Sequence, residues 1–221
     1  MFDGQSFKEE LERRLNSIRR IVAATHPAVP TTGLPDAARE ARGLAILLLF
    51  ACYENLMHSV CRRILEIASA LRVGNHRLRP GIRLFAIHGE VQALKAGAPK
   101  SVWTGKGIRL VNSALESRAC TINPDLFPND GSFMKRSQVA VICELFELGD
   151  PGPILGPVWD RLDTIVSERN AIAHGRKTPE EIGRNYSLAE IEDLVSLWSS
   201  HWFAFIDHIE TQAGTRDFYR T

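Results

Sequence analysis

A run of ten residues without a charged side chain, Leu44 to Tyr53, restricts the fold more than any other part of the chain. It lies inside a stretch from Asp36 to about Val73 that contains no proline and predicts one long helix, begun by Asp36 and ended by Gly74-Asn75. A helix that is apolar all round must be buried on every side. The run falls short of the roughly 20 residues that span a bilayer. We therefore expect a central helix surrounded by other helices.

Amphipathic segments near both ends of the chain predict the surrounding helices. Ser6 and Glu9 form a capping-box pattern before a helix that stops at His26-Pro27. Ser187 and Glu190 form another before the final helix. No run alternates polar and apolar residues for long enough to require a sheet. The final helix carries its apolar residues at helical spacing: Leu188, Ile191, Leu194, Val195, Trp198, Trp202, Phe205, Ile206 and Ile209.

The segment from 74 to 132 is the least regular, and we expect short helices only near 82–96 and 106–117. Aromatic residues are interspersed among basic ones here, an arrangement that can bind single-stranded nucleic acid. The commoner explanation is a solvated face whose aromatic side chains anchor the segment to the core. The basic residues are Arg77, Arg79, Arg83, Lys95, Lys100, Lys106 and Arg109, and the aromatic ones are Phe85, Trp103 and Phe127.

A predicted helix that begins near Pro157 or Val158 carries polar groups where a core helix has leucine. At 100° per residue, Arg169 lies roughly 20° from the line through Val158, in the middle of the apolar stripe. Asn170 lies at the edge of that stripe, and His174 lies in the last turn before Gly175. A guanidinium on a buried face is costly unless it is paired and hydrogen-bonded. This helix is therefore the strongest candidate for a functional site.

Spacing alone leaves two interpretations of these residues. In the structural one, Arg169 reaches a carboxylate across a helix interface and His174 caps backbone carbonyls. In the functional one, both side chains act on a ligand. Glu54 is the first charge after the apolar run and is our candidate partner for Arg169, unless it is a plain surface residue.

The segment from Leu162 to Gly175, with Arg169-Asn170 followed by Ile172-Ala173-His174-Gly175, resembles the signature of HEPN-domain proteins. That signature is an arginine, four to six residues and a histidine, often with asparagine after the arginine. The RiboL-PSP-HEPN type is the most similar variety. The resemblance implies an all-α fold: a HEPN-like up-and-down bundle in a single domain, residues 1–221, with extra short helices in the 74–132 insertion.

The resemblance also implies a metal-independent endoribonuclease. In such enzymes a 2′-hydroxyl attacks the adjacent phosphorus, leaving a 2′,3′-cyclic phosphate and a 5′-hydroxyl. Two motifs face each other in a homodimer, so Arg169 and His174 of both copies would be catalytic. Asn170 would orient the phosphate or the histidine. Arg176 and Lys177 either add contacts to RNA phosphates or form an ordinary loop.

The biological role implied is that of a toxin or anti-phage defence effector, with an antitoxin or regulatory protein as a possible partner. Related toxins often carry tyrosine two residues after the histidine. Arg176 stands at that position, so regulation by modification of such a tyrosine is not supported. The alternatives are a non-catalytic HEPN dimer that serves as an RNA-binding or protein-interaction scaffold, and a small nucleotide-sensing domain.

Composition narrows the remaining classes. Seven scattered histidines and four cysteines without a CxxC pair predict no metal site, and no Gly-rich phosphate loop is present, so we expect no cofactor. The net charge of +1 means that any basic surface must be local. Cys52 and Cys61 are interpreted as buried hydrophobic residues of a reducing compartment. With no signal-peptide pattern at the N-terminus, we expect a cytoplasmic protein that does not bind membranes.

Overall fold

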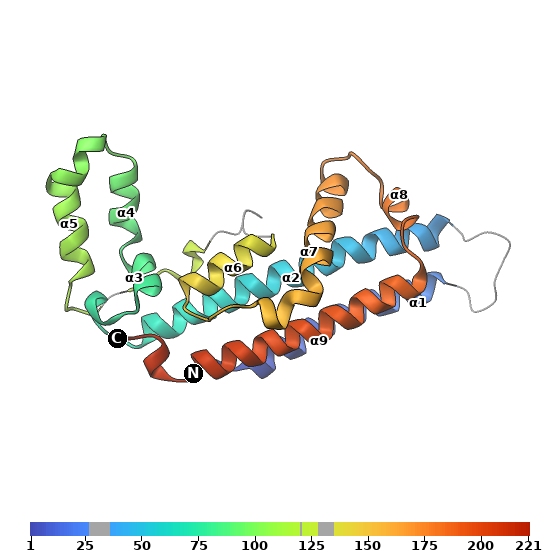
Figure 1. Ribbon diagram of the computed structural model, residues 1–221, viewed down its shortest axis with the longest axis horizontal. Helices are drawn as coiled ribbons and strands as arrows, with labels where there is room; N and C mark the ends of the chain where they lie inside the picture. Colours follow the sequence, from blue (N-terminus) through green and yellow to red (C-terminus); the bar gives the residue numbers. More distant parts are fainter. Residues whose placement is uncertain (27–35, 120, 128–134) are drawn as a thin grey trace.

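The computed structural model describes residues 1–26, 36–119, 121–127 and 135–221, and over these ranges the protein is all-α, without a β-strand. Three long helices, α1 (Gly4–Thr25), α2 (Asp36–Ala70) and α9 (Leu188–Ala213), run side by side as a layer (Figure 1). Helix α7 (Gly152–Ala173) packs on α2 and α9. The predicted all-α bundle is therefore confirmed. The proline-rich segment 27–35 lies outside the described residues.

Helix α2 is the centre of the bundle, as the apolar run predicted. Tyr53, Trp198 and Trp202 are fully buried, and the rings of Tyr53 and Trp202 lie 5.0 Å apart. The burial is less complete than expected, because Leu44 is exposed. By length and composition α2 could cross a membrane, but 56% of its most apolar window is buried among the other helices. It therefore serves as the core helix of this bundle.

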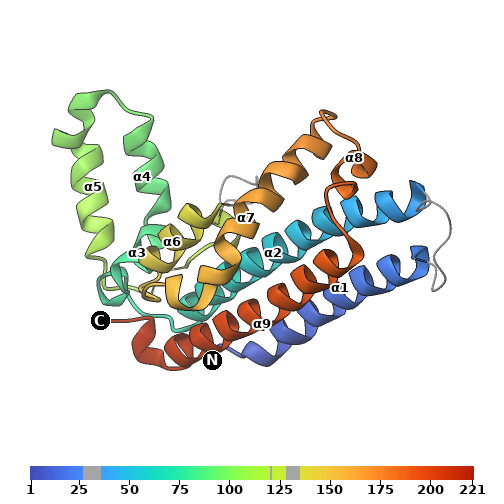
Figure 2. The ribbon, with the colours of Figure 1, turned by 45° about the vertical axis from the view of Figure 1, so that its right-hand side comes forward.

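Most of the described part of the 74–132 segment is helical. It contains α3 (Pro80–Ala86), α4 (His88–Lys95) and α5 (Gly105–Ala114), with 3-10 turns at Asn75–Arg77, Pro99–Trp103 and Pro124–Leu126. The expected helix over 82–96 is divided at Ile87. We call residues 88–115 the arm, because α4 and α5 form a hairpin that stands away from the long helices (Figures 1 and 2).

Helix boundaries depart from the expected ones where another group provides the cap. Helix α1 begins at Gly4, because the Asp3 carboxylate accepts the Gln5 N–H at 3.1 Å. Ser6 therefore lies inside the helix, and its predicted capping box with Glu9 is wrong. The run Thr178-Pro179-Glu180-Glu181 also predicts a helix start, and the capping boxes at Thr178–Glu181 and Ser187–Glu190 are both present. Helix α7 begins earlier than expected and includes Pro157.

Two histidines of α9 hold the start of α7 and the residues before it in place. His201 Nδ1 lies 2.8 Å from the carbonyl oxygen of Ile154, in the first turn of α7, and His208 Nε2 lies 2.6 Å from that of Leu148, which precedes the helix. Their positions off the apolar stripe predict two surface residues, but both side chains are partly buried, so that prediction is wrong. The spacing of residues 137–148 predicts a helix with Val141 inward, but on α6 (Arg136–Leu145) that side chain is exposed.

The short helix α8 (Pro179–Gly183) fixes the segment after α7 to the beginning of α2. A Cβ added to Gly43 would lie 1.9 Å from the Pro179 carbonyl oxygen. One added to Gly183 would lie 1.8 Å from the Arg39 carbonyl oxygen. The buried Arg42 donates to the Gly183 carbonyl oxygen at 3.0 Å. These backbone-to-backbone contacts, here called the α2–α8 seam, leave no room for larger residues.

Candidate functional site

The C-terminal end of α7 is closed by a Schellman motif. The Arg176 N–H donates to the Ala171 carbonyl at 2.8 Å, and the Gly175 N–H donates to that of Ile172 at 2.9 Å. Gly175 has a φ of +66°, a conformation that favours glycine. The chain therefore reverses immediately after His174, which is the C-cap residue. A glycine directly after the last turn is expected to follow the C-cap residue, and the structure confirms this position for Gly175.

Arg169 is half-buried, and its guanidinium stacks on an aromatic ring instead of pairing with an acid. The guanidinium carbon lies 4.5 Å from the centre of the Phe50 ring, within cation–π range. One nitrogen, Nη1, donates to Asn170 Oδ1 at 3.0 Å. In the described ranges no carboxylate lies within ion-pair distance of Arg169. The stack and the amide hold the guanidinium while leaving most of its N–H donors for a ligand.

Glu54 is not the counter-charge of Arg169 in this chain, so that proposed pairing is wrong within a single subunit. No ion pair joins the two among the described residues. Glu54 follows Phe50 by four residues, which moves it about 6 Å along α2. Phe50 therefore occupies the position opposite Arg169.

His174, Arg176 and Lys177 are all exposed at the end of α7. For the described residues, no ion pair neutralises either cation and no side-chain hydrogen bond engages the imidazole. At 100° per residue, His174 lies about 140° round the helix from Arg169. One chain thus places a fixed guanidinium and an open imidazole near the same helix end, but on different faces.

A half-buried carboxyl next to Arg169 in the chain, that of Glu168, was missed from the sequence. Tyr186 donates its phenolic proton to Glu168 Oε2 at 2.6 Å. Burial raises the pKa of Glu168, an effect that the Tyr186 hydrogen bond and Lys177 only partly offset. Burial and the Glu168 hydrogen bond likewise raise the pKa of Tyr186. The available signal was spacing, because Glu168 lies three residues after Ile165 and four before Ile172, both on the apolar side.

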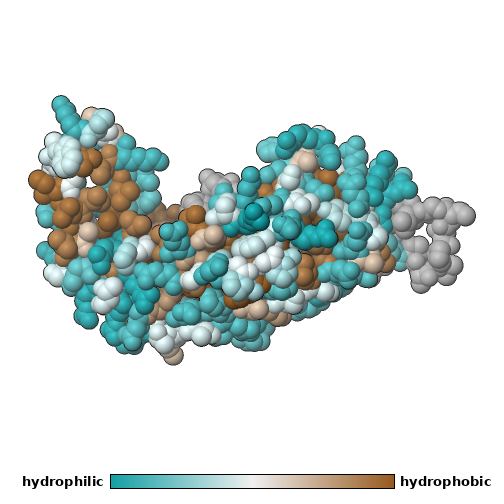
Figure 3. Space-filling model, viewed as in Figure 1, coloured by the Kyte–Doolittle hydropathy of each residue, from teal (hydrophilic) through white to brown (hydrophobic). Residues whose placement is uncertain are grey.

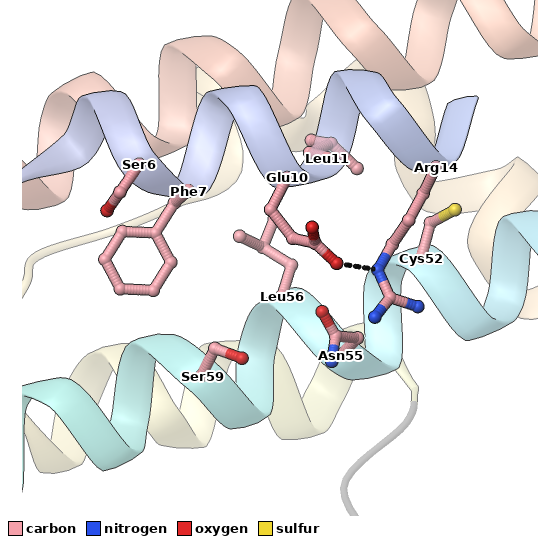
Figure 4. A pocket seen from close by; sticks show the side chains of 9 residues that line it. All are labelled: Ser6, Phe7, Glu10, Leu11, Arg14, Cys52, Asn55, Leu56 and Ser59. Carbon is pink, nitrogen blue, oxygen red and sulfur yellow. Dashed lines mark hydrogen bonds and ion pairs between the residues drawn. The ribbon is translucent and has the colours of Figure 1, made fainter. Parts of the chain in front are cut away.

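A separate cavity of about 180 Å³ lies between α1 and α2 (Figure 4). Its lining includes Phe7, Cys52 and Asn55, together with the hydrogen-bonded pair of Glu10 and Arg14. At 100° per residue, Cys52 faces roughly opposite to Phe50 on α2. The cavity is therefore remote from the α7 end, and it is smaller than the roughly 300 Å³ at which ligand pockets begin.

Burial explains the cysteines that the structure describes. Cys52, Cys61 and Cys143 are buried free thiols. Burial raises the pKa of Cys52 to about 11 and that of Cys143 to about 12, so neither is a nucleophile near neutral pH. The interpretation of Cys52 and Cys61 as hydrophobic core residues is confirmed. Cys120 lies outside the described residues.

Comparison with known proteins gave no match. No family model matches the chain, and neither a curated protein nor a solved structure shows significant similarity to it. The residues at the end of α7, with their resemblance to the HEPN signature, are therefore the features of the chain from which a function can be inferred.

Proposed function

We propose that the protein is a metal-independent endoribonuclease, with an active site that two copies of the chain complete. The observation that carries the proposal is the half-buried guanidinium of Arg169, held by Phe50 and Asn170 with no described carboxylate paired to it. A structural arginine would be expected to have an acidic partner or, like the buried Arg42, a backbone carbonyl acceptor, and among the described residues Arg169 has neither. A planar fork of donors is well suited to a phosphate.

The arrangement around Arg169 favours an anionic polymer. Arg176 and Lys177 add two exposed positive charges at the same helix end, while the whole chain has a net charge of only +1. This local excess would attract a phosphodiester backbone. Because His174 and Arg169 lie on different faces of α7, one chain offers an incomplete set. A second copy related by a two-fold axis would supply the missing group.

The proposed reaction needs only proton transfers and charge stabilisation. The oxygen of a ribose 2′-hydroxyl attacks the adjacent phosphorus, and its proton passes to His174 of one copy. The bond from phosphorus to the 5′-oxygen breaks, and that oxygen takes a proton from His174 of the other copy. The two Arg169 side chains stabilise the charge on the phosphorane oxygens. The products are a 2′,3′-cyclic phosphate and a 5′-hydroxyl, and such proton transfers contribute about 10²–10⁴-fold each.

The test is incubation of the purified chain with total RNA in EDTA, followed by analysis of the new ends. Wild type is expected to leave cyclic phosphate and 5′-hydroxyl ends, and His174→Ala to cleave at least about 100-fold more slowly. Arg184→Ala, which changes the exposed C-cap arginine of α8 paired with Glu180, is the control and should cleave normally. Equal cleavage by wild type and His174→Ala would remove the assignment.

A scaffold role is the second candidate, favoured by the packing of Arg169 on Phe50 of its own chain. In that case the α7 end holds a dimer or a partner protein and cleaves nothing. It predicts no cleavage of any RNA by wild type, together with loss of self-association in Arg169→Ala. The roles of a cytoplasmic toxin or anti-phage effector, and of a regulatory partner protein, are part of the same proposal.

A further inference from the structure

The arm carries an apolar surface that no described part of the chain covers. Ten large hydrophobic side chains are exposed in the described ranges, and half of them lie in the arm, so exposure is concentrated there rather than scattered. Figure 3 shows this concentration as a brown area over α4 and α5. The five are Val102, Trp103, Ile108, Val111 and Leu115.

Three of these residues form a stripe along α5. At 100° per residue, Ile108, Val111 and Leu115 fall within about 60° of arc. Their exposed fractions are 61%, 56% and 64%, so the stripe is not shared with the bundle. Lys106 and Arg109 lie more than about 100° from its centre. An uncharged stripe of this kind is typical of a helix that packs on another helix, whereas a nucleic-acid surface would place its cations on it.

The size of the patch fits a protein interface. Trp103 is 86% exposed, and an aromatic side chain can bury about 150–250 Å². With the stripe residues, the patch is on the order of a few hundred Å², the size at which an exposed apolar surface often marks an interaction site. A stable interface needs about 800 Å² from each partner, with an apolar core and a polar rim. The patch would supply the core, and the arm's basic residues the rim.

The occupant is best explained as the same surface of a second copy. Outside the arm, the exposed hydrophobic side chains of the described chain are divided among the N-terminus, α1, α2, α3 and α6, with one in each: Met1, Ile21, Leu44, Leu84 and Val141. Only the arm therefore offers a matching apolar face. The arm and the end of α7 also rise from the same side of the long-helix layer (Figures 1 and 2). A two-fold axis along the layer on that side would bring arm to arm and α7 end to α7 end together.

We propose that the α5 stripe and Trp103 form a dimer interface, in which two arms pack antiparallel about a two-fold axis. This inference rests on the proposed function to the extent that the same axis would unite the two α7 ends. The arm holds four basic side chains and one acidic one, so two paired arms repel each other. Added salt should therefore strengthen the dimer, the reverse of what it does to binding of RNA or of an acidic protein.

The test is sedimentation equilibrium of the full chain, comparing Ile108→Glu and Val111→Glu with the control Arg109→Glu. All three place an acidic group at an exposed position on α5, so the fold should survive, which circular dichroism checks. The two stripe variants are expected to weaken dimerisation at least tenfold, and the control to weaken it little or not at all. In a Cys120→Ser background, Val111→Cys is expected to form a covalent dimer on oxidation.

Three results would overturn the proposal. They are a monomeric wild type, equal effects of all three substitutions, and dimerisation that survives the stripe variants but is lost in Arg169→Ala. The last would leave the nuclease intact and move its interface to α7 alone. Conversely, loss of dimer in the stripe variants with no RNA cleavage by wild type would support the arm interface and end the nuclease proposal. Cleavage by the stripe variants that recovers at high protein concentration would support both.

Discussion

The end of α7 and the arm both project from the long-helix layer, but they differ in how they are held and in what they expose. The α7 end is fixed by the Schellman motif and the α2–α8 seam, and its exposed residues are His174, Arg176 and Lys177. The arm stands off the bundle and exposes Trp103 with the α5 stripe. Figure 3 shows the contrast, with teal over the α7 end and brown over the arm.

The difference distinguishes a site, where side chains are fixed in position, from an apolar contact surface. A reactive site needs side chains that are held in position, and at the α7 end the glycines and the buried Arg42 of the α2–α8 seam hold the backbone. A protein interface depends on apolar surface area more than on the exact position of each side chain. The arm offers such area and has few contacts with the bundle. The largest expected differences between the two regions should therefore come from changes to backbone packing.

A matched pair of glycine substitutions tests the contrast most strongly. Gly183→Ala forces a methyl group to within 1.8 Å of the Arg39 carbonyl oxygen, and we expect it to lower the free energy of unfolding by roughly 3 kcal/mol. Gly89→Ala in α4 meets nothing within 4 Å and should raise it by about 0.5 kcal/mol. Urea unfolding measures both. Similar effects from the two changes would mean that the α7 end is no better anchored than the arm.

A double-mutant cycle addresses how Arg169 is held. Phe50→Leu and Arg169→Met, made singly and together, should show a coupling of about 1 kcal/mol in the free energy of unfolding. The comparison is the pair of Arg79 and Phe218, where the guanidinium lies 5.6 Å from the ring and also binds Glu147. That pair should couple by less than about 0.5 kcal/mol. A coupling near zero for the first pair would leave Arg169 without its aromatic support.

The smallest expected change in the free energy of unfolding concerns the half-buried carboxyl of Glu168. The pKa of Glu168 is raised above 4.5 in the folded chain, so the folded state binds its proton more tightly than the unfolded one. The free energy of unfolding therefore falls as pH rises from 4.5 through the raised pKa. Glu168→Gln should remove this fall, a change below about 1 kcal/mol because the group is half-exposed and screened. Urea midpoints between pH 4 and 7 check it, and parallel curves for the two proteins would contradict it.

The features that could be predicted from sequence were those set by neighbouring residues. The caps at Thr178 and Ser187, the reversal at Gly175 and the central position of α2 all follow from local spacing. The Glu54 pairing failed because it depended on the register of α2 against α7, which no local pattern encodes. Spacing likewise placed His201 and His208 away from the core, and only the tertiary path of residues 148–154, which enter α7, gives them carbonyl partners.

The 74–132 segment, which includes the arm, shows the same limit from the other direction. The aromatic and basic residues of this segment were most readily explained as core anchors and a solvated face. Phe85 and Phe127 do pack inward, and Phe85 stacks on Phe146 with ring centres 5.7 Å apart. Trp103 does not, because its 3-10 turn lies between α4 and α5, beyond the reach of the bundle. Whether an apolar side chain is buried depends on its position in the tertiary structure, which composition does not reveal.

The α2–α8 seam has a consequence for the order in which the chain matures. Arg42 and Gly183 are separated by 141 positions, so their contact cannot form until most of the polypeptide has left the ribosome. A nascent chain that ends before α8 already contains residues 169–175. It lacks the α2–α8 seam, which fixes the segment after α7. The α7 end is therefore fixed in its final position only late in the synthesis of the chain.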